Sequence, residues 1–296
     1  MNTVPNTGPQ ALSLSDAAFA QISALARAEA GLILPASKIT MVQSRLRSRL
    51  TALNIASYEA YAKFVAGAEG DVERRMMISA LTTNVSHFFR ENHHFEILRR
   101  DAFPELLQQA RKGEGIRIWS AGCSSGQEPF SIAMLIHEYA PELVGQDTLI
   151  LASDIDPKIM EAAEAGAYSE QQIAGIPLEM QKKYLKKNGS QYHVSANLKK
   201  MIRFRELNLI GNWPMRTKFD VIFCRNVVIY FDSETQNALW PRFRNALKPS
   251  GWFFLGHSER VADTAANDFQ SVGMTAYRPI QNRNQTQSTL TNAREA

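Results

Sequence analysis

Polar and small residues that could hold a nucleotide-like ligand follow four predicted strands, each where the strand ends. They are the loop 122–126, which begins with Gly122, and Glu128 after the first strand, Asp154 and Asp156 after the second, Asn208 after the third, and Arg225 and Asn226 after the fourth. Parallel strands end at one edge of a sheet, where open α/β proteins bind their ligands. The sequence therefore predicts one pocket lined by carboxylates, amides and a guanidinium.

The stretch 116–131 carries the strongest local signal. Ile116, Ile118 and Trp119 predict a buried strand, small residues fill the loop after it, and a proline suits the first turn of the helix that follows. Asp154, at the end of the next strand, could accept hydrogen bonds from ribose hydroxyls. The loop matches neither G-x-G-x-x-G nor G-x-x-x-x-G-K-[ST], which favours a ligand with ribose and adenine but no phosphates. S-adenosylmethionine is the commonest ligand of that kind.

Alternating strands and helices position these residues. Such alternation is typical of an α/β domain with a doubly wound parallel sheet. The segment 168–200 is too long and polar for a plain connection, and predicts a small inserted subdomain. Strands are predicted at 116–120, 148–153, 201–207, 219–224 and 251–256, and helices near 129–139 and 157–165.

A helical pattern precedes the α/β part and predicts a separate all-α domain. A polar hinge at 82–84 then leads into a helical stretch that contains HFFRENHHFEIL. Both ends of the chain are polar and unpatterned, which predicts disordered tails. The predicted boundaries are a tail at 1–12, the helical domain at 13–81, a linker with the start of a helix at 82–92, the α/β domain at 93–280 and a tail at 281–296.

Composition restricts the class of protein. With 296 residues, 45% of them hydrophobic, the chain can bury a sizeable core, and no apolar run approaches the roughly 20 residues of a membrane span. The first residues lack the basic and apolar regions of a signal peptide, so a cytoplasmic location is expected. Two cysteines, Cys123 and Cys224, argue against a disulfide framework and a structural zinc site. A net charge of +4 favours an acidic partner without deciding its class.

Several motifs occur in a characteristic order and together resemble the CheR family, the methyltransferases that esterify glutamates of chemotaxis receptors. They are LTTNVSHFFRE at 81–91, SAGCSSGQEPFSIA at 120–133, ASDID at 152–156, FRELNL at 204–209, FDVIFCRNVVIYF at 219–231 and LKPSGWFFLGHSE at 247–259. Over residues 15–280 the resemblance implies an N-terminal helical domain and a Rossmann-like methyltransferase domain with an inserted β-subdomain.

The resemblance also implies roles for individual residues. Asn84, Ser86 and Arg90 belong to the segment that covers S-adenosylmethionine, with Arg90 paired to the methionine carboxylate. Ser86 stands where the family usually has threonine, and Gln127 where it often has a second glutamate. The other implied cofactor contacts are Gly122, Glu128, Asp154 on the ribose, Asn208 and Leu209 on the adenine side, Arg225 and Asn226.

The expected reaction needs little acid–base machinery. A glutamate with a pKa of about 4.3 is already ionised at pH 7, so methyl transfer to it requires no general base. Catalysis then depends on positioning. Tyr230 is the candidate for orienting the target carboxylate, with Arg90 near enough to contribute, and a tyrosine merely packed at a strand end is the alternative.

A basic stripe lies beside the apolar face of the predicted helix 38–53. It consists of Lys38, Arg45, Arg47 and Arg49. A solvated face is one interpretation, and the resemblance implies the other, contact with the acidic methylation helices of a chemoreceptor. The segment KKNGSQYHVSAN is shorter than in family members that dock on a receptor's C-terminal peptide, so no such tether is expected. A monomer without nucleic-acid binding or membrane insertion is expected.

The sequence thus predicts a cytoplasmic protein-glutamate O-methyltransferase that acts on membrane chemoreceptors in chemotaxis adaptation. A module that binds the cofactor or its product and regulates a partner without turnover is the alternative. A nucleic-acid methyltransferase is disfavoured because no Pro-Pro-Tyr type motif for a flipped base is present. No metal is expected, because His93 and His94 have no carboxylate or cysteine at ligand spacing, and His257 is placed at the rim of the pocket.

Overall fold

The computed structural model describes residues 13–281, and the chain divides into two compact units between Thr83 and Asn84. Apart from Gln281, the predicted disordered tails at 1–12 and 281–296 lie outside the described residues. The first unit is all-α, as predicted. It contains α1 (Asp16–Ala30), η1 (Ala36–Lys38), α2 (Ile39–Leu53), α3 (Tyr58–Ala66), η2 (Ala68–Gly70) and α4 (Asp71–Leu81).

An ion pair and two arginine contacts tie α2 to α4. The guanidinium of Arg49 donates to both carboxylate oxygens of Glu73, at 2.9 and 2.6 Å, and the hydroxyl of Tyr61 donates to the same carboxylate at 2.8 Å. Arg45 Nη1 donates to the carbonyl oxygens of Leu81 and Thr82 at the end of α4, each at 2.8 Å. Two cations of the basic stripe are therefore engaged inside this unit.

The second unit is built on a seven-stranded sheet with the order β6-β2-β1-β7-β8-β10-β9. The five strands predicted from the sequence are parallel neighbours, and an antiparallel hairpin that was not predicted extends the sheet. The strands are β1 (Ile116–Ala121), β2 (Thr148–Asp154), β6 (Ile202–Glu206), β7 (Phe219–Cys224), β8 (Leu247–Leu255), β9 (Phe269–Gly273) and β10 (Ala276–Pro279).

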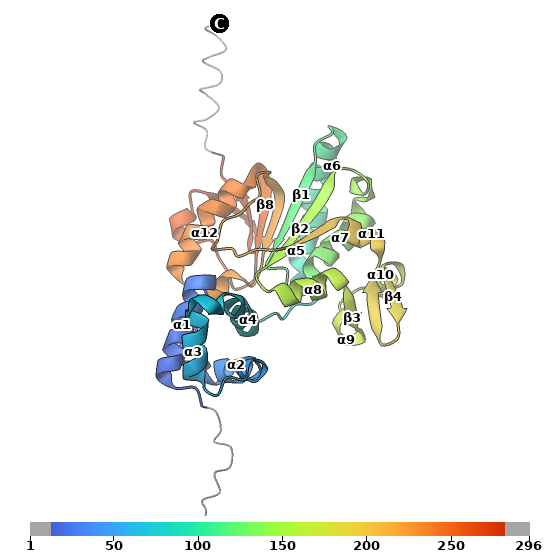
Figure 1. Cartoon of the computed structure of the whole chain (residues 1–296). Helices are drawn as coiled ribbons and strands as arrows, with labels where there is room; N and C mark the ends of the chain where they lie inside the picture. The colour runs from blue at the N-terminus through green and yellow to red at the C-terminus, as the bar shows by residue number, and fades with distance from the viewer. Residues whose placement is uncertain (1–12, 282–296) are drawn as a thin grey trace, which may run out of the picture. The chain divides into compact units, whose positions relative to one another are not determined.

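Helices cover both faces of this sheet, as Figure 1 shows with α7 and α12 on opposite sides. The helices are α5 (Asn92–Ile97), the π-helical turn η3 (Leu98–Ala102), α6 (Phe103–Arg111), α7 (Gln127–Tyr139), η4 (Pro141–Leu143), α8 (Pro157–Ala165), η5 (Val228–Tyr230), α12 (Ser233–Ala246) and η6 (Asp263–Ala265). None of the helices between residues 13 and 281 combines the length and apolarity that a membrane span requires.

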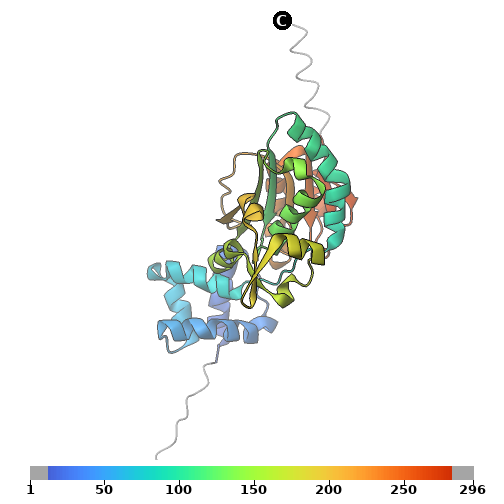
Figure 2. The same cartoon turned by 90° about the vertical axis from the view of Figure 1, so that its right-hand side faces the viewer.

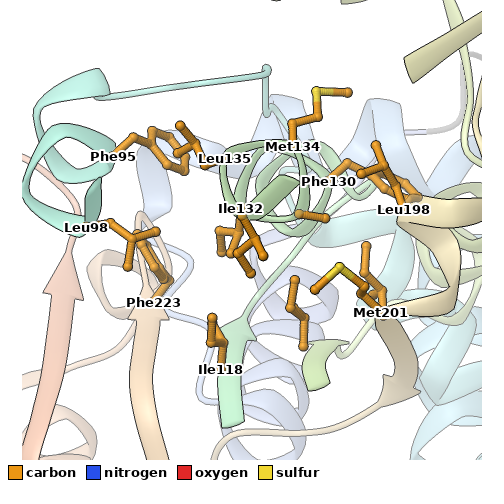
Figure 3. Close-up of a cluster of buried hydrophobic side chains, with 14 of the residues drawn as sticks. Phe95, Leu98, Ile118, Phe130, Ile132, Met134, Leu135, Leu198, Met201 and Phe223 are labelled. Carbon is orange, nitrogen blue, oxygen red and sulfur yellow. The ribbon is translucent and has the colours of Figure 1, made fainter. Parts of the chain in front are cut away.

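Side chains of successive strand residues alternate between the two faces, so each face has its own core. Ile118 and Phe223 belong to the cluster that includes α5, α6 and α7, and Figure 3 shows them beneath Ile132 of α7. Trp119 follows Ile118 and Ile222 precedes Phe223, and both belong to the cluster on the α12 side. Nearly every residue of β1 and β7 is buried, because helices cover both faces of the sheet.

The insertion predicted at 168–200 contains a small antiparallel sheet with the order β3-β5-β4. Gly189 and Ser190 alone join β4 to β5 in a tight hairpin. Figure 2 shows this part of the chain, in yellow-green and yellow, beside the helices of the same unit. Its elements are β3 (Ala167–Ser169), α9 (Glu170–Ile173), α10 (Leu178–Tyr184), β4 (Leu185–Asn188), β5 (Gln191–Val194) and α11 (Ala196–Lys200).

The predicted helix through HFFRENHHFEIL is wrong in its first half, because α5 begins only at Asn92. Phe89 and Glu91 both have φ of 55°, a left-handed conformation that interrupts any helix. The backbone N–H of Phe89 donates instead to Ser131 Oγ of α7 at 3.0 Å. Arg90 therefore lies on a turn packed against α7.

We expect Glu73→Ala to lower the free energy of unfolding by about 3 kcal/mol, because it leaves the largely buried guanidinium of Arg49 without its partner. Glu69→Ala, which removes an exposed carboxylate from the same unit, should change it by less than about 0.5 kcal/mol. Urea unfolding followed by helical circular dichroism measures both. Equal transitions for the two variants would contradict a stabilising role for the pair.

Candidate functional site

The predicted polar residues meet where β2, β1 and β7 end side by side. Ala121 at the end of β1 is in register with Ser153, so the loop that begins at Gly122 lies directly beside Asp154. The backbone N–H groups of Gly122 and Cys123 donate to the carbonyl oxygen of Ser153 at 2.8 and 2.9 Å. The parallel pairing of these strands therefore gathers residues that are up to a hundred positions apart.

The loop 122–126 requires glycine where it turns. Gly122 has φ of 80°, and a Cβ atom there would lie 2.3 Å from Val227 Cγ2, so an L side chain is excluded by both conformation and space. Ser124, with φ of 50°, points its backbone N–H at Asp154 Oδ2, 2.9 Å away. The other oxygen of Asp154 accepts from the N–H of Asp156 at 3.1 Å, and burial raises the pKa of the Asp154 carboxyl. The loop thus holds one buried carboxylate in a fixed orientation.

Asn84 precedes Ser124 of this loop by 40 residues in the sequence but contacts it directly. Its side-chain amide donates to Asp156 Oδ2 at 2.8 Å, and its carbonyl oxygen accepts from Ser124 Oγ at 3.0 Å. Asp156 also caps α8 by accepting from the N–H of Lys158 at 3.0 Å. Ser86, two residues further on, is half-buried. The segment predicted to cover the cofactor therefore begins in contact with the loop 122–126.

Arg225 and Glu128 form the charged centre of the site. Arg225 Nη1 lies 3.5 Å from Glu128 Oε2, and Ser120 Oγ donates to the other oxygen of Glu128 at 2.6 Å. Burial raises the pKa of Glu128, against the opposing charge of Arg225. The Arg225 side chain is 2% exposed, and its Nε and Nη1 make no hydrogen bond within residues 13–281. Its Nη2 donates to the backbone carbonyl of Arg90.

Glu91 connects the other groups around Arg225, and the sequence analysis did not single it out. One carboxylate oxygen lies 3.6 Å from Arg225 Nε and 3.6 Å from His94 Nδ1. The other lies 3.0 Å from His257 Nδ1 and 3.3 Å from Asn226 Nδ2. Burial raises the pKa of Glu91, but Arg225 and the hydrogen bonds outweigh burial and lower it to about 2. The sequence feature that could have identified Glu91 is its position directly after Arg90 in the motif FFRE.

Glu91, His93 and His94 offer ligand atoms within 4.8 Å of one another. The expectation that no carboxylate stands at ligand spacing from these histidines is wrong, because Glu91 lies three residues before His94. His94 Nε2, however, already contacts Thr275 Oγ1 at 2.9 Å and Met274 O at 3.0 Å. Burial first, and then the charge of Arg225, lower the pKa of His94 to about 3. A guanidinium beside the same carboxylate opposes a second cation, so this group fits Arg225 better than a metal.

The remaining predicted cofactor and catalytic residues lie around the same strand ends. Leu209 is buried after β6, and Asn208 Oδ1 accepts from the N–H of Ile210 at 3.1 Å. Tyr230 is half-buried at the end of η5, in the chain that leaves β7 through Asn226, whose φ is 59°. Arg90 is 28% exposed, and its Nη1 donates to the carbonyl of Val85 at 2.9 Å.

The basic stripe of the first unit is not uniform. Lys38 and Arg47 are exposed, whereas Arg45 and Arg49 are half-buried and hydrogen-bonded to α4. Helical periodicity places all four residues beside one face, but it does not predict which of them are exposed and which are hydrogen-bonded. That depends on the acidic and carbonyl groups that a neighbouring helix supplies. That the four residues of the basic stripe form a receptor-binding surface stays a prediction.

The donors at the strand ends suit S-adenosylmethionine. The carboxylates of Asp154, which is buried, and of Glu128, whose side chain is 13% exposed, match hydroxyl and ammonium groups. The N–H groups of Arg225 that make no hydrogen bond within the described residues match a carboxylate. The glycine at 122 lets the loop pass tightly against Val227. A doubly wound sheet with these donors at its carboxyl edge defines an S-adenosylmethionine-dependent methyltransferase.

Comparison with known families makes the assignment specific. Residues 17–82 match the profile described as CheR methyltransferase, all-alpha domain, and residues 84–278 match CheR methyltransferase, SAM binding domain. The chain belongs to the CheR methyltransferase family. This confirms the resemblance read from the motifs, the predicted fold class and S-adenosylmethionine as the cofactor.

Curated relatives are similar over most of their length. A probable chemotaxis protein methyltransferase of Rhizobium etli is 46% identical over 254 residues, which are 84% of this chain and 95% of that protein. A chemotaxis protein methyltransferase of Klebsiella aerogenes is 39% identical over 273 residues, which are 90% of this chain and 91% of the relative. The chain is thus similar to chemotaxis methyltransferases through both of its units.

We expect Glu91→Gln to destabilise the protein at pH 7 by about 3 kcal/mol, the free energy that corresponds to a pKa lowered from 4.5 to about 2. Because the pKa is depressed in the folded state, this contribution is present above pH 4.5 and is lost as the pH falls toward 2. The difference between variant and wild type should therefore shrink as the pH falls below 4.5.

Urea unfolding at pH 7, 5, 4 and 3.5 measures this difference. Glu96→Gln is the control, because the Glu96 side chain is 53% exposed and pairs only with Arg99 on the surface. A Glu91→Gln deficit that does not depend on pH would contradict the ionic role of Glu91.

Proposed function

We propose that this chain methylates glutamate side chains of membrane chemoreceptors in the cytoplasm, forming methyl esters in chemotaxis adaptation. The observation that carries the proposal is the set of buried Asp154, buried Arg225 and 13%-exposed Glu128 at the carboxyl edge of the sheet, in a member of the CheR family. The names of the relatives supply the chemotaxis context.

The proposed reaction is an in-line displacement on a methyl carbon. When bound, S-adenosylmethionine supplies a methyl group activated by a sulfonium. An oxygen of the target carboxylate forms the new C–O bond while the S–CH₃ bond breaks, and the electron pair of that bond remains on sulfur. The target glutamate is ionised at neutral pH, so the protein need not remove a proton. Its contribution is to orient the two reactants and exclude water.

Different residues of the site bind the cofactor and orient the target carboxylate. Asp154 and Glu128 hold the polar groups of the cofactor, with Asp154 on the ribose, and Asn84, Ser86, Gly122, Asn208, Leu209, Arg225 and Asn226 complete the proposed contacts. Arg90 pairs with the methionine carboxylate and lies on a turn that Arg225 fixes through its bond to the Arg90 carbonyl. Tyr230, which is half-buried at the end of η5, orients the target carboxylate.

Receptor recognition is proposed to use the exposed cations of the first unit. Lys38 and Arg47 are free to meet the acidic methylation helices, whereas Arg45 and Arg49 support the surface by bracing α2 against α4. The hairpin between β4 and β5 has only Gly189 and Ser190 in its turn, which supports recognition without a tether to the receptor's C-terminal peptide. The proposed enzyme is a monomer and does not bind nucleic acid.

We expect the wild-type protein to transfer labelled methyl from S-adenosylmethionine to chemoreceptor-containing membranes as alkali-labile label released as methanol. Asp154→Ala removes a buried charged acceptor of hydrogen bonds, which should weaken cofactor binding in calorimetry by about 10- to 100-fold. Arg90→Ala should abolish most of the label. Glu138→Gln, remote from the strand ends, is the control.

Cofactor binding by the wild type without any label would favour the regulatory module over the enzyme. Label that resists alkali would contradict a glutamate ester and indicate a different acceptor.

We expect Tyr230→Phe to lower kcat about 10-fold with less than a twofold change in the affinity for S-adenosylhomocysteine, because a positioning hydroxyl acts on the target carboxylate alone. Initial rates with receptor membranes and calorimetry with the product measure the two quantities. Tyr192→Phe in the inserted sheet is the matched control. An unchanged kcat would assign Tyr230 to packing.

A further inference from the structure

Glu259 follows β8 and is buried, yet its carboxylate has no basic side chain as a partner among the described residues. Instead, four backbone N–H groups point at its two oxygens. One oxygen accepts from Asn226 at 2.8 Å and from Gly256 at 2.6 Å, and the other accepts from Val227 at 2.9 Å and from Ile229 at 3.2 Å. Such a concave arrangement of N–H groups is a typical anion site, here filled by a side chain of the same chain.

These donors come from two turns that leave neighbouring strands. The turn 226–230 follows β7, and the turn 256–259 follows β8. Their close approach requires Gly256, because a Cβ atom there would lie 2.6 Å from Asn226 Nδ2 and 2.7 Å from the Asn226 backbone nitrogen. Asn226 itself has φ of 59°, a conformation that L residues adopt only when surrounding contacts hold it. The carboxylate of Glu259 provides those contacts.

The segment that Glu259 holds is the one that carries two residues of the site. Asn226 donates from its side chain to Glu91 at 3.3 Å, and Tyr230 ends the short helix η5 whose first turn the carboxylate caps through Val227 and Ile229. Burial raises the pKa of Glu259, while its backbone hydrogen bonds oppose that rise. Without an acceptor, the N–H groups of Val227 and Ile229 would have to find other partners, and the turn would rearrange.

We propose that Glu259 is a positioning residue for methyl transfer, which sets the conformation of the turn 226–230 and so places Asn226 against the cofactor and Tyr230 against the acceptor carboxylate. This inference rests on the proposed function. Glu259 itself touches neither reactant and acts through the backbone of the turn. Glu259 is the last residue of the motif LKPSGWFFLGHSE at 247–259, and no role was predicted for it.

The test compares Glu259→Gln with Glu105→Gln. Glutamine keeps the shape of the side chain but replaces one accepting oxygen by an N–H₂ group, which cannot accept from Asn226 and Gly256 or from Val227 and Ile229. Glu105 is a control of the same unit, because its carboxylate binds the side chains of Arg278 and Trp252 away from the strand ends. Both variants are assayed at 25 °C, where the folded fraction is checked by circular dichroism.

We expect Glu259→Gln to lower kcat and the affinity for S-adenosylhomocysteine at least 10-fold each, while KM for receptor membranes changes less than twofold. In a Tyr230→Phe background the additional loss of kcat should be smaller than in the wild-type background, since part of the effect of Glu259 on kcat acts through Tyr230. Glu105→Gln should retain both parameters. Full kcat and product affinity in Glu259→Gln, with only a lower Tm, would overturn the proposal.

Failure of the proposed function is separable from failure of this inference. If the wild type binds S-adenosylhomocysteine but methylates no receptor, the proposed substrate is wrong, and the binding measurement decides on Glu259 by itself. Affinity reduced at least 10-fold in Glu259→Gln would then support its positioning role through Asn226, and unchanged affinity would overturn it.

Discussion

The site depends on one buried guanidinium. Arg225 lies between two carboxylates, 3.6 Å from Glu91 and 3.5 Å from Glu128, and donates to the backbone of Arg90. A buried charge is tolerated only where opposite charges and hydrogen bonds replace water. Because Glu91 and Arg90 lie in the turn before α5, Glu128 lies at the start of α7 and Arg225 itself follows β7, satisfying this one charge brings together three segments of the site.

Backbone geometry supports the same region through conformations that few residues adopt. Glu91, Ser124 and Asn226 all have positive φ without being glycine, and each lies at the carboxyl edge of the sheet. Such conformations persist where surrounding contacts determine them, and they concentrate at functional sites. Ser124 and Asn226 donate backbone hydrogen bonds to the carboxylates of Asp154 and Glu259, whereas Glu91 supplies the carboxylate that Asn226 and His257 contact. The rigid sheet beneath supplies the fixed reference for all of them.

Much of the fold was predictable because buried strands and helices have recognisable apolar patterns in the sequence. The five parallel strands, the helices after β1 and β2 and the position of the insertion were expected from apolar runs and turn residues. The hairpin β9–β10 was missed because its exposed strand β9, FQSVG, has no apolar alternation of its own. The prediction of a helix through HFFRE was wrong because helix propensity does not include tertiary contacts. Here the backbone of Phe89 donates to Ser131, and Glu91 lies beside Arg225.

The sequence by itself determined the family, the cofactor class and which residue types stand at the strand ends, because motifs and periodicity are properties of neighbours along the chain. Only the tertiary structure decided the partners of each charge. It engaged Arg45 and Arg49 with α4 while leaving Lys38 and Arg47 exposed, and it made Glu91 and Glu259 organisers of the site. Pairing energies depend on distances between residues far apart in sequence, and folding alone sets those distances.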